Sequence, residues 1–178
     1  MQKRIIITGG PGTGKSSIIK DLEERGYKCI HEVSREITLA AQKEGINQLF
    51  LEKPILFSER ILEARILQFE QASTLEKDMI FIDRGIPDVL AYMDYFKTNY
   101  PSIFDRACND YRYDIVYLLP PWEDIYLADN ERYESFSQSL EIHHHLQNTY
   151  LSYGYAPIEV PIGTVASRSE FILNHLGN

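Results

Sequence analysis

A glycine-rich stretch near the start of the chain has the residue types and spacing of a phosphate-binding loop. Residues 9–16 read GGPGTGKS and match G-x-x-x-x-G-K-[ST] at every position. Main-chain N–H groups at the start of a helix bind phosphate oxygens, and glycines let them come close. Lys15 is expected to reach the β and γ phosphates, and the Ser16 hydroxyl to bind Mg²⁺. The candidate residues for binding ATP or GTP are therefore Gly9, Gly10, Pro11, Gly12, Thr13, Gly14, Lys15, Ser16 and Ser17.

An aspartate and an arginine end the apolar stretch at residues 79–84, MIFIDR. The carboxylate of Asp83 could hold Mg²⁺ or its water beside Ser16, and it could also cap the helix that follows. The guanidinium of Arg84 could bind a phosphate or hydroxyl of a second substrate, or simply pair with Asp83. Hydrolytic ATPases of the large AAA type usually carry a second carboxylate at this position. Arginine therefore favours transfer of phosphate to an acceptor.

Glu32 is expected at the same edge of the sheet, because it lies near the end of the second predicted strand, YKCIHEV. Its carboxylate could accept a proton from an acceptor hydroxyl, which requires an approach to about 3 Å. A solvated cap or an ion pair with Arg35 is the alternative interpretation. His31 is another candidate for the base, although a single histidine on a strand is more often structural.

A polar helical stretch at roughly residues 121–152 is longer than a simple crossover requires, which favours a mobile lid. Arg132 is its only basic side chain before the histidines, and we expect it to reach the γ phosphate. A surface ion pair with Asp129 or Glu131 is the alternative. The three histidines at residues 143–145 are interpreted as a solvated helix face, since consecutive helical residues point about 100° apart and cannot chelate one ion together.

Alternating strands and helices must position these residues. β-Branched and apolar runs predict strands at residues 5–8, 27–33, 79–83, 114–119 and 156–160. Apolar residues at helical spacing predict a helix at residues 15–25, closed by Gly26, and a long helix within residues 50–78. This order predicts an α/β fold whose parallel sheet binds ligands at the carboxyl ends of its strands. Thr164 is expected to cap the last helix, and its turn with Gly163 either faces the nucleobase or only begins that helix.

Composition sets further limits. The chain has 178 residues, of which 44% are hydrophobic, and these are ordinary values for one globular domain over residues 1–178. A net charge of −8 argues against long nucleic acids, which bind basic surfaces. No run approaches the roughly 20 apolar residues of a membrane span, and the apolar run at residues 5–8 is too short for the core of a signal sequence, so export is not expected. Cys29 and Cys108 lack metal-ligand spacing, so reduced thiols in a cytoplasmic protein are expected.

Five segments together resemble the NadR-type AAA domain family of small P-loop ATPase and kinase-like proteins: GGPGTGKSS, HEVSRE, DRGIPDVLAY, LLPPWEDIYLADNERYESF and YGYAPIEVP. The family is similar to nucleoside and nucleoside-monophosphate kinases. This implies a three-layer αβα P-loop NTPase fold with strand order 2-3-1-4-5, a substrate cleft between Glu32 and Arg84, and a lid carrying Arg132. Members named for nicotinamide nucleotide metabolism can also carry an adenylyltransferase domain, for which this chain has no room. Nicotinamide riboside is therefore one candidate acceptor among several.

Two classes of function fit these observations. In the first, the protein transfers the γ-phosphoryl group of Mg-ATP to a small acceptor such as a nucleoside or nucleotide, which Glu32 and Arg84 orient. In the second, ATP or GTP orders the lid and an adjacent surface for a protein partner or another ligand, with slow hydrolysis. A slow ATPase in which Glu32 activates water is a further alternative.

Overall fold

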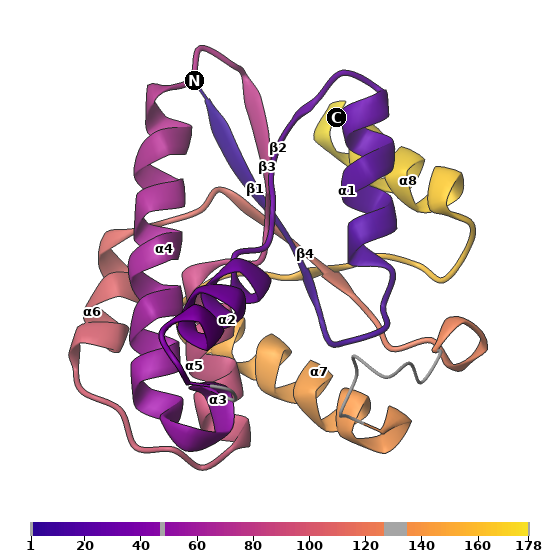
Figure 1. Ribbon diagram of the computed structural model, residues 1–178. Coiled ribbons are helices and arrows are strands. Elements are labelled where there is room, and N and C mark those ends of the chain that lie inside the picture. Colours follow the sequence, from indigo (N-terminus) through magenta and orange to yellow (C-terminus); the bar gives the residue numbers. More distant parts are fainter. Residues whose placement is uncertain (1, 47–48, 127–134, 178) are drawn as a thin grey trace.

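The computed structural model describes residues 2–46, 49–126 and 135–177, and it contains a five-stranded sheet with helices on both faces (Figure 1). The strands are β1 (Lys3–Gly9), β2 (Lys28–Ile30), β3 (Met79–Asp83), β4 (Ile115–Leu119) and β5 (Ile158–Glu159). They pair in parallel in the order β2-β3-β1-β4-β5. The predicted α/β class and the 2-3-1-4-5 order of a P-loop fold are confirmed.

The helices form the two outer layers. They are α1 (Lys15–Glu24), α2 (Ser34–Lys43), α3 (Leu49–Glu52), α4 (Pro54–Thr74), α5 (Ile86–Tyr95), α6 (Ile103–Asp110), the 3₁₀ turn η1 (Glu123–Ile125), α7 (Phe136–Ser152) and α8 (Val165–Gly177). Figure 1 shows α1 and α8 on one side of the sheet, with α4 to α7 on the other. None of the described helices is long and apolar enough to cross a membrane.

The central strand β1 is buried on both faces, as expected for a parallel sheet between two helical layers. Ile5 and Ile7 are fully buried in the apolar cluster that α1 and α8 complete, and Ile6 is buried in the cluster formed with α4, α5 and α6. Successive side chains of a strand point to opposite faces, so one short run of isoleucines contributes to both halves of the core. This packing fixes where β1 ends and the glycine-rich loop begins.

Two predicted strands are longer than the observed ones. The prediction for residues 27–33 included Glu32, but β2 ends at Ile30. The Glu32 carboxylate accepts hydrogen bonds from the N–H groups of Val33 and Ser34 at 3.1 and 3.2 Å, which turns the chain into α2. The prediction for residues 156–160 is likewise too long, because β5 is an edge strand in which Ile158 and Glu159 pair with β4.

The sequence predicted some of the observed helices and helix ends but not others. Gly26 ends α1 with φ 90°, and the Ser167 N–H donates to the Thr164 hydroxyl at 3.1 Å, so both predicted helix ends are confirmed. Helix α2 was not predicted, and Ala41 is its one fully buried residue. The long predicted helix is α4, which starts at Pro54, a residue favoured in a first helical turn.

The prediction of a solvated histidine face at residues 143–145 is wrong for its first member. His143 is buried, and its Nε2 lies 3.6 Å from a Glu159 carboxylate oxygen. Burial lowers the pKa of His143, which the nearby Glu159 opposes. Helix α7 lies against the sheet with this side chain inward, whereas His144 is exposed. Cys29 and Cys108 are buried free cysteines, in agreement with the expectation of reduced thiols.

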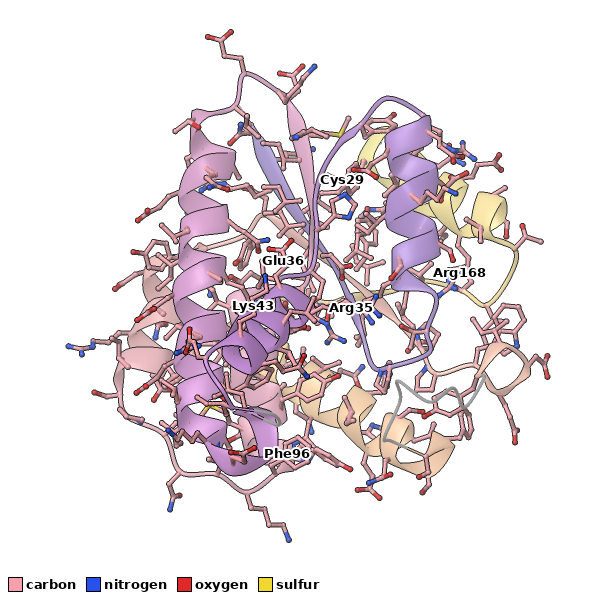
Figure 2. The ribbon with its side chains drawn as sticks, viewed as in Figure 1. Cys29, Arg35, Glu36, Lys43, Phe96 and Arg168 are labelled. Carbon is pink, nitrogen blue, oxygen red and sulfur yellow. The ribbon has the colours of Figure 1, made fainter. Side chains whose placement is uncertain are left out.

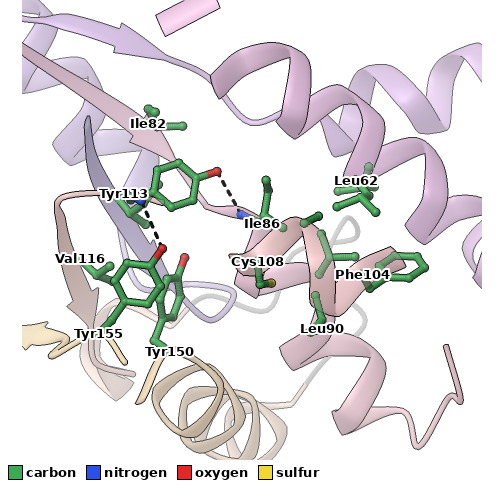
Figure 3. Packing of buried hydrophobic residues seen from close by; sticks show 14 of the residues in the cluster. Leu62, Ile82, Ile86, Leu90, Phe104, Cys108, Tyr113, Val116, Tyr150 and Tyr155 are labelled. Atoms are coloured by element: carbon green, nitrogen blue, oxygen red, sulfur yellow. Dashed lines mark hydrogen bonds between the residues drawn. The ribbon is translucent and has the colours of Figure 1, made fainter. Parts of the chain in front are cut away.

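The hydroxyl groups of three tyrosines form hydrogen bonds with buried polar groups of the protein. The Tyr113 N–H donates to the Tyr155 hydroxyl, and the Ile86 N–H donates to the Tyr113 hydroxyl, each at 3.2 Å (Figure 3). The Tyr150 hydroxyl donates to the carboxylate of Asp88 at 2.5 Å, and that carboxylate is only 1% exposed. Helix α7 is therefore tied to the start of α5 through a buried charge.

Replacing Tyr150 with Phe tests this tie. The variant should unfold with a free energy lower by roughly 1.5–3 kcal/mol, because the buried Asp88 carboxylate loses a donor. Denaturant unfolding followed by circular dichroism measures the change. Tyr153→Phe is the matched control, since that hydroxyl donates to the carboxylate of Asp105 near the surface. Equal losses in the two variants would contradict the account of Asp88.

Candidate functional site

The glycine-rich loop joins β1 to α1 at the carboxyl edge of the sheet. An added Cβ at Gly9 would lie 2.7 Å from the carbonyl oxygen of Leu119, so only glycine fits there without a shift of the backbone. Gly14 has φ 84°, a left-handed conformation that favours glycine, and directly precedes the first turn of α1. The loop therefore presents main-chain N–H groups at a helix N-terminus, as a phosphate site requires.

Lys15 is the first residue of α1 and directly follows this loop. Its side chain is largely buried, and its Nζ donates to the carbonyl oxygens of Gly9 and Gly10 at 2.9 and 2.8 Å. Burial, and secondarily repulsion from Arg84, lower the pKa of Lys15 to about 7 against the attraction of nearby carboxylates. The Lys15 ammonium group is thus held by neutral carbonyl oxygens. The phosphate oxygens of a bound nucleotide would replace these contacts with stronger, negatively charged ones.

Asp83 ends β3 beside the loop, where it is only 5% exposed. Among the described residues its Oδ1 has no hydrogen-bond partner, and burial raises its pKa against the attraction of Lys15 and Arg84. The alternative role as a helix cap is wrong, because Gly85 occupies the N-cap of α5 and its N–H donates to the Asp88 carboxylate at 2.9 Å.

The residues present fit a magnesium ion bound together with phosphates. The unpartnered carboxylate oxygen of Asp83 and the exposed hydroxyl of Ser16 are oxygen ligands of the kind that Mg²⁺ accepts, usually one or two from the protein. Within the described residues, no group of three or more His, Cys, Asp or Glu side chains could hold a metal by itself. Any ion here would depend on the nucleotide for its remaining ligands.

Glu32 and Arg84 are brought together as a partly buried ion pair. The Arg84 Nε lies 2.5 Å from Glu32 Oε2, so Arg84 pairs with Glu32 and not with Asp83 as one alternative proposed. Arg84 has φ 71°, an unusual left-handed conformation for a side chain other than glycine, and strain of this kind is concentrated at functional sites. Burial alone would raise the pKa of Glu32, but Arg65 and Arg84 lower it to about 2.

Sequence reasoning missed Arg65 and Asp88. Arg65 is buried on α4, where its Nη2 lies 3.4 Å from Glu32 Oε1. The Asp88 carboxylate accepts a hydrogen bond from Thr8 Oγ1 at 2.5 Å, and lies 3.4 Å from Arg84 Nη1. A sequence signal for Arg65 was available. This charged residue lies three positions after Leu62, at the spacing of the buried apolar residues of α4.

A cavity of about 360 Å³ lies beside the phosphate loop. It is lined by the loop, by Trp122 and the η1 segment, and by the turn at Gly163 and Thr164, which fits the expectation that this turn faces a nucleobase. Arg168 at the start of α8 also lines it and donates from Nη1 to the Thr13 carbonyl oxygen at 3.0 Å. Figure 2 shows Arg168 near the first turn of α1.

The predicted lid at residues 121–152 includes residues 127–134, which the structure does not describe. Arg132 and its alternative partners Asp129 and Glu131 lie outside the described residues, so the role of Arg132 stays a prediction. On the described flanks of residues 121–152, the chain forms η1 and then α7.

Solved structures share this fold at low sequence identity. A deoxyadenosine kinase from M. mycoides with the products dCMP and dCDP bound matches 98% of this chain and 98% of its own, with a TM-score of 0.74 and 21% identity. The same enzyme with dATP gives a TM-score of 0.71 at 20% identity, and coverage of 98% and 100%. The NadR protein in complex with NR has a TM-score of 0.76 and 16% identity, with 98% of this chain covering 50% of that one.

These identities establish similarity of fold. No curated protein matches the sequence significantly. A model of a protein family, described as an AAA domain, matches residues 4–168 and so includes the phosphate loop, Glu32, Asp83 and Arg84. With most of its length matched, the chain belongs to the AAA domain family.

Proposed function

We propose that this protein is a Mg-ATP-dependent kinase that transfers the γ-phosphoryl group to a hydroxyl of a small acceptor, with nucleosides as the leading class. One observation carries the proposal. The turn that carries Arg84 lies against the strand that leads into the phosphate loop, because the Arg84 N–H donates to the Ile7 carbonyl oxygen at 3.0 Å, and the Arg84 side chain pairs with Glu32. A donor phosphate at Lys15 and an acceptor at Glu32 would therefore be neighbours.

The roles follow from charge and geometry. Lys15 and the main-chain N–H groups would neutralise the β and γ phosphates, while Ser16 and Asp83 would hold Mg²⁺, which supplies further positive charge when bound. The acceptor oxygen forms a bond to the γ phosphorus as the bond to the β–γ bridging oxygen breaks, and ADP leaves. The hydroxyl proton passes to Glu32 and then to solvent.

The low pKa of Glu32 constrains how it acts. A carboxylate with a pKa of about 2 is ionised at neutral pH, so it accepts the acceptor's hydrogen bond but is a weak base at the outset. This suits phosphoryl transfer, whose loose transition state leaves most of catalysis to positioning and charge neutralisation. We therefore assign to Glu32 the orientation of the hydroxyl, with proton acceptance late in the transfer.

Charge balance favours a neutral acceptor over a phosphorylated one. On the acceptor side, the arginines Arg65 and Arg84 face the carboxylates Glu32 and Asp88. Within this set of described residues the two cations offset the two anions, which favours an acceptor without a phosphate group. A nucleoside hydroxyl is neutral and needs no additional positive charge. The fold is also shared with a deoxyadenosine kinase.

An ADP-release assay against nucleosides, deoxynucleosides, nucleoside monophosphates and sugars tests the proposal. We expect release that depends on a nucleoside, that Lys15→Ala abolishes, and that Glu32→Gln lowers by roughly 100-fold or more. Nucleotide binding with no turnover on any acceptor would indicate the switch, and turnover indifferent to acceptor would indicate an ATPase. Either result would contradict the kinase.

The pKa of Lys15 makes a second prediction. At pH 8 a lysine with a pKa of about 7 is mostly neutral, and a bound polyphosphate raises that pKa, so binding should take up about one proton. At pH 6 the uptake should be close to zero. Calorimetry of Mg-ATP binding in two buffers of different ionisation enthalpy measures it. Lys15→Arg is the control, because arginine stays charged, and undiminished uptake in that variant would contradict the assignment.

A further inference from the structure

Arg65 is a buried cation that the proposed chemistry does not use directly. It lies on α4 with 5% of its side chain exposed, on the face of the helix that packs against the core. Moving a guanidinium out of water costs several kcal/mol unless its N–H groups find good partners. Its partners therefore indicate what the residue does.

Two of those partners belong to the site. Arg65 Nη1 donates to the carbonyl oxygen of Gly85 at 2.5 Å, and Nη2 lies 3.4 Å from Glu32 Oε1. Gly85 directly follows Arg84, whose φ of 71° makes this turn unusual. One planar guanidinium thus contacts the residue that leads from β2 into α2 and the turn after β3, which lie 33 and 20 residues from Arg65 in the sequence.

The Glu32 carboxylate is consequently held from both sides. Arg84 Nε approaches Oε2, while Arg65 and the N–H groups of Val33 and Ser34 approach Oε1. These contacts leave little freedom for rotation of the carboxylate plane. Arg65 is also the strongest of the influences that lower the pKa of Glu32.

We propose that Arg65 is a positioning residue for the transfer reaction, which holds the Glu32 carboxylate and the Arg84–Gly85 turn in the geometry that receives the acceptor hydroxyl. This inference rests on the proposed function. Arg65 acts through Glu32 and Arg84 and does not itself touch the substrate. A planar fork with fixed N–H directions can hold two oxygens at once, which a lysine ammonium cannot do in the same way.

Carbon-13 NMR titration of the Glu32 carboxyl group, assigned with Glu32→Gln, tests the hold on Glu32 directly. In Arg65→Met the pKa of Glu32 should rise by about one unit or more from its low value. Arg60→Met is the matched control on the same helix, because Arg60 pairs with Glu44 at 2.7 Å outside this cluster, and it should leave the Glu32 titration unchanged. An unmoved titration in Arg65→Met overturns the inference.

Kinetics test the consequence for transfer. In Arg65→Met, kcat should fall roughly 10- to 100-fold while KM for ATP changes less than about twofold, since the phosphate loop is untouched. Arg65→Lys keeps the charge, so the pKa of Glu32 should stay low while kcat still falls. A kcat in both Arg65 variants equal to that of Arg60→Met overturns the inference.

The two readouts separate this inference from the proposed function. A wild-type protein with no acceptor-dependent turnover would refute the kinase and with it the role in transfer, whereas the titration would still show whether Arg65 holds Glu32. If Arg65→Met fails to fold by circular dichroism, Arg65→Lys decides. Its kcat must then fall with an unchanged KM for ATP, and a kcat equal to that of Arg60→Met overturns the role.

Discussion

Buried charges of opposite sign, gathered at the carboxyl ends of β1, β2 and β3, are the constraint on which this structure depends. Three cations face three carboxylates there: Lys15, Arg65 and Arg84, with Glu32, Asp83 and Asp88. None of these groups could be buried alone without a large cost, so each requires the others. They come from helices α1, α4 and α5, from strand β3, and from the turns that follow β2 and β3. The cluster therefore forms only when the sheet and its helices are assembled.

The layers of the fold give this cluster its rigidity. The double-sided burial of β1 fixes the loop that carries Lys15, and Thr8 at the end of the same strand binds the Asp88 carboxylate. The same carboxylate accepts a hydrogen bond from Tyr150 on α7, a helix within the predicted lid at residues 121–152. Thr8 beside the phosphate loop, Arg84 and helix α7 thus all contact one buried carboxylate, that of Asp88.

Much of this could be predicted from sequence because the decisive signals were local. The spacing of Gly9, Gly14, Lys15 and Ser16 specifies the phosphate loop, and strand ends placed Asp83 and Glu32 at one edge. The role of Arg65 could not be predicted, because its partners lie 20 and 33 residues away in the sequence and contact it only in the folded protein. The burial of His143 escaped for the same reason, since the sheet face that covers it is a tertiary feature.

The Lys15 ammonium group is held by the neutral carbonyl oxygens of Gly9 and Gly10. We propose that it exchanges these contacts for the phosphates of a nucleotide bound with Mg²⁺. Equilibrium binding of ATP to the wild-type protein and to Lys15→Ala, with Mg²⁺ and with a chelator, tests it most directly. The account predicts saturable binding that weakens when Mg²⁺ is removed and that falls by roughly 100-fold or more in Lys15→Ala. Equal affinity in the two proteins, or no affinity for ATP or GTP in either, would contradict it.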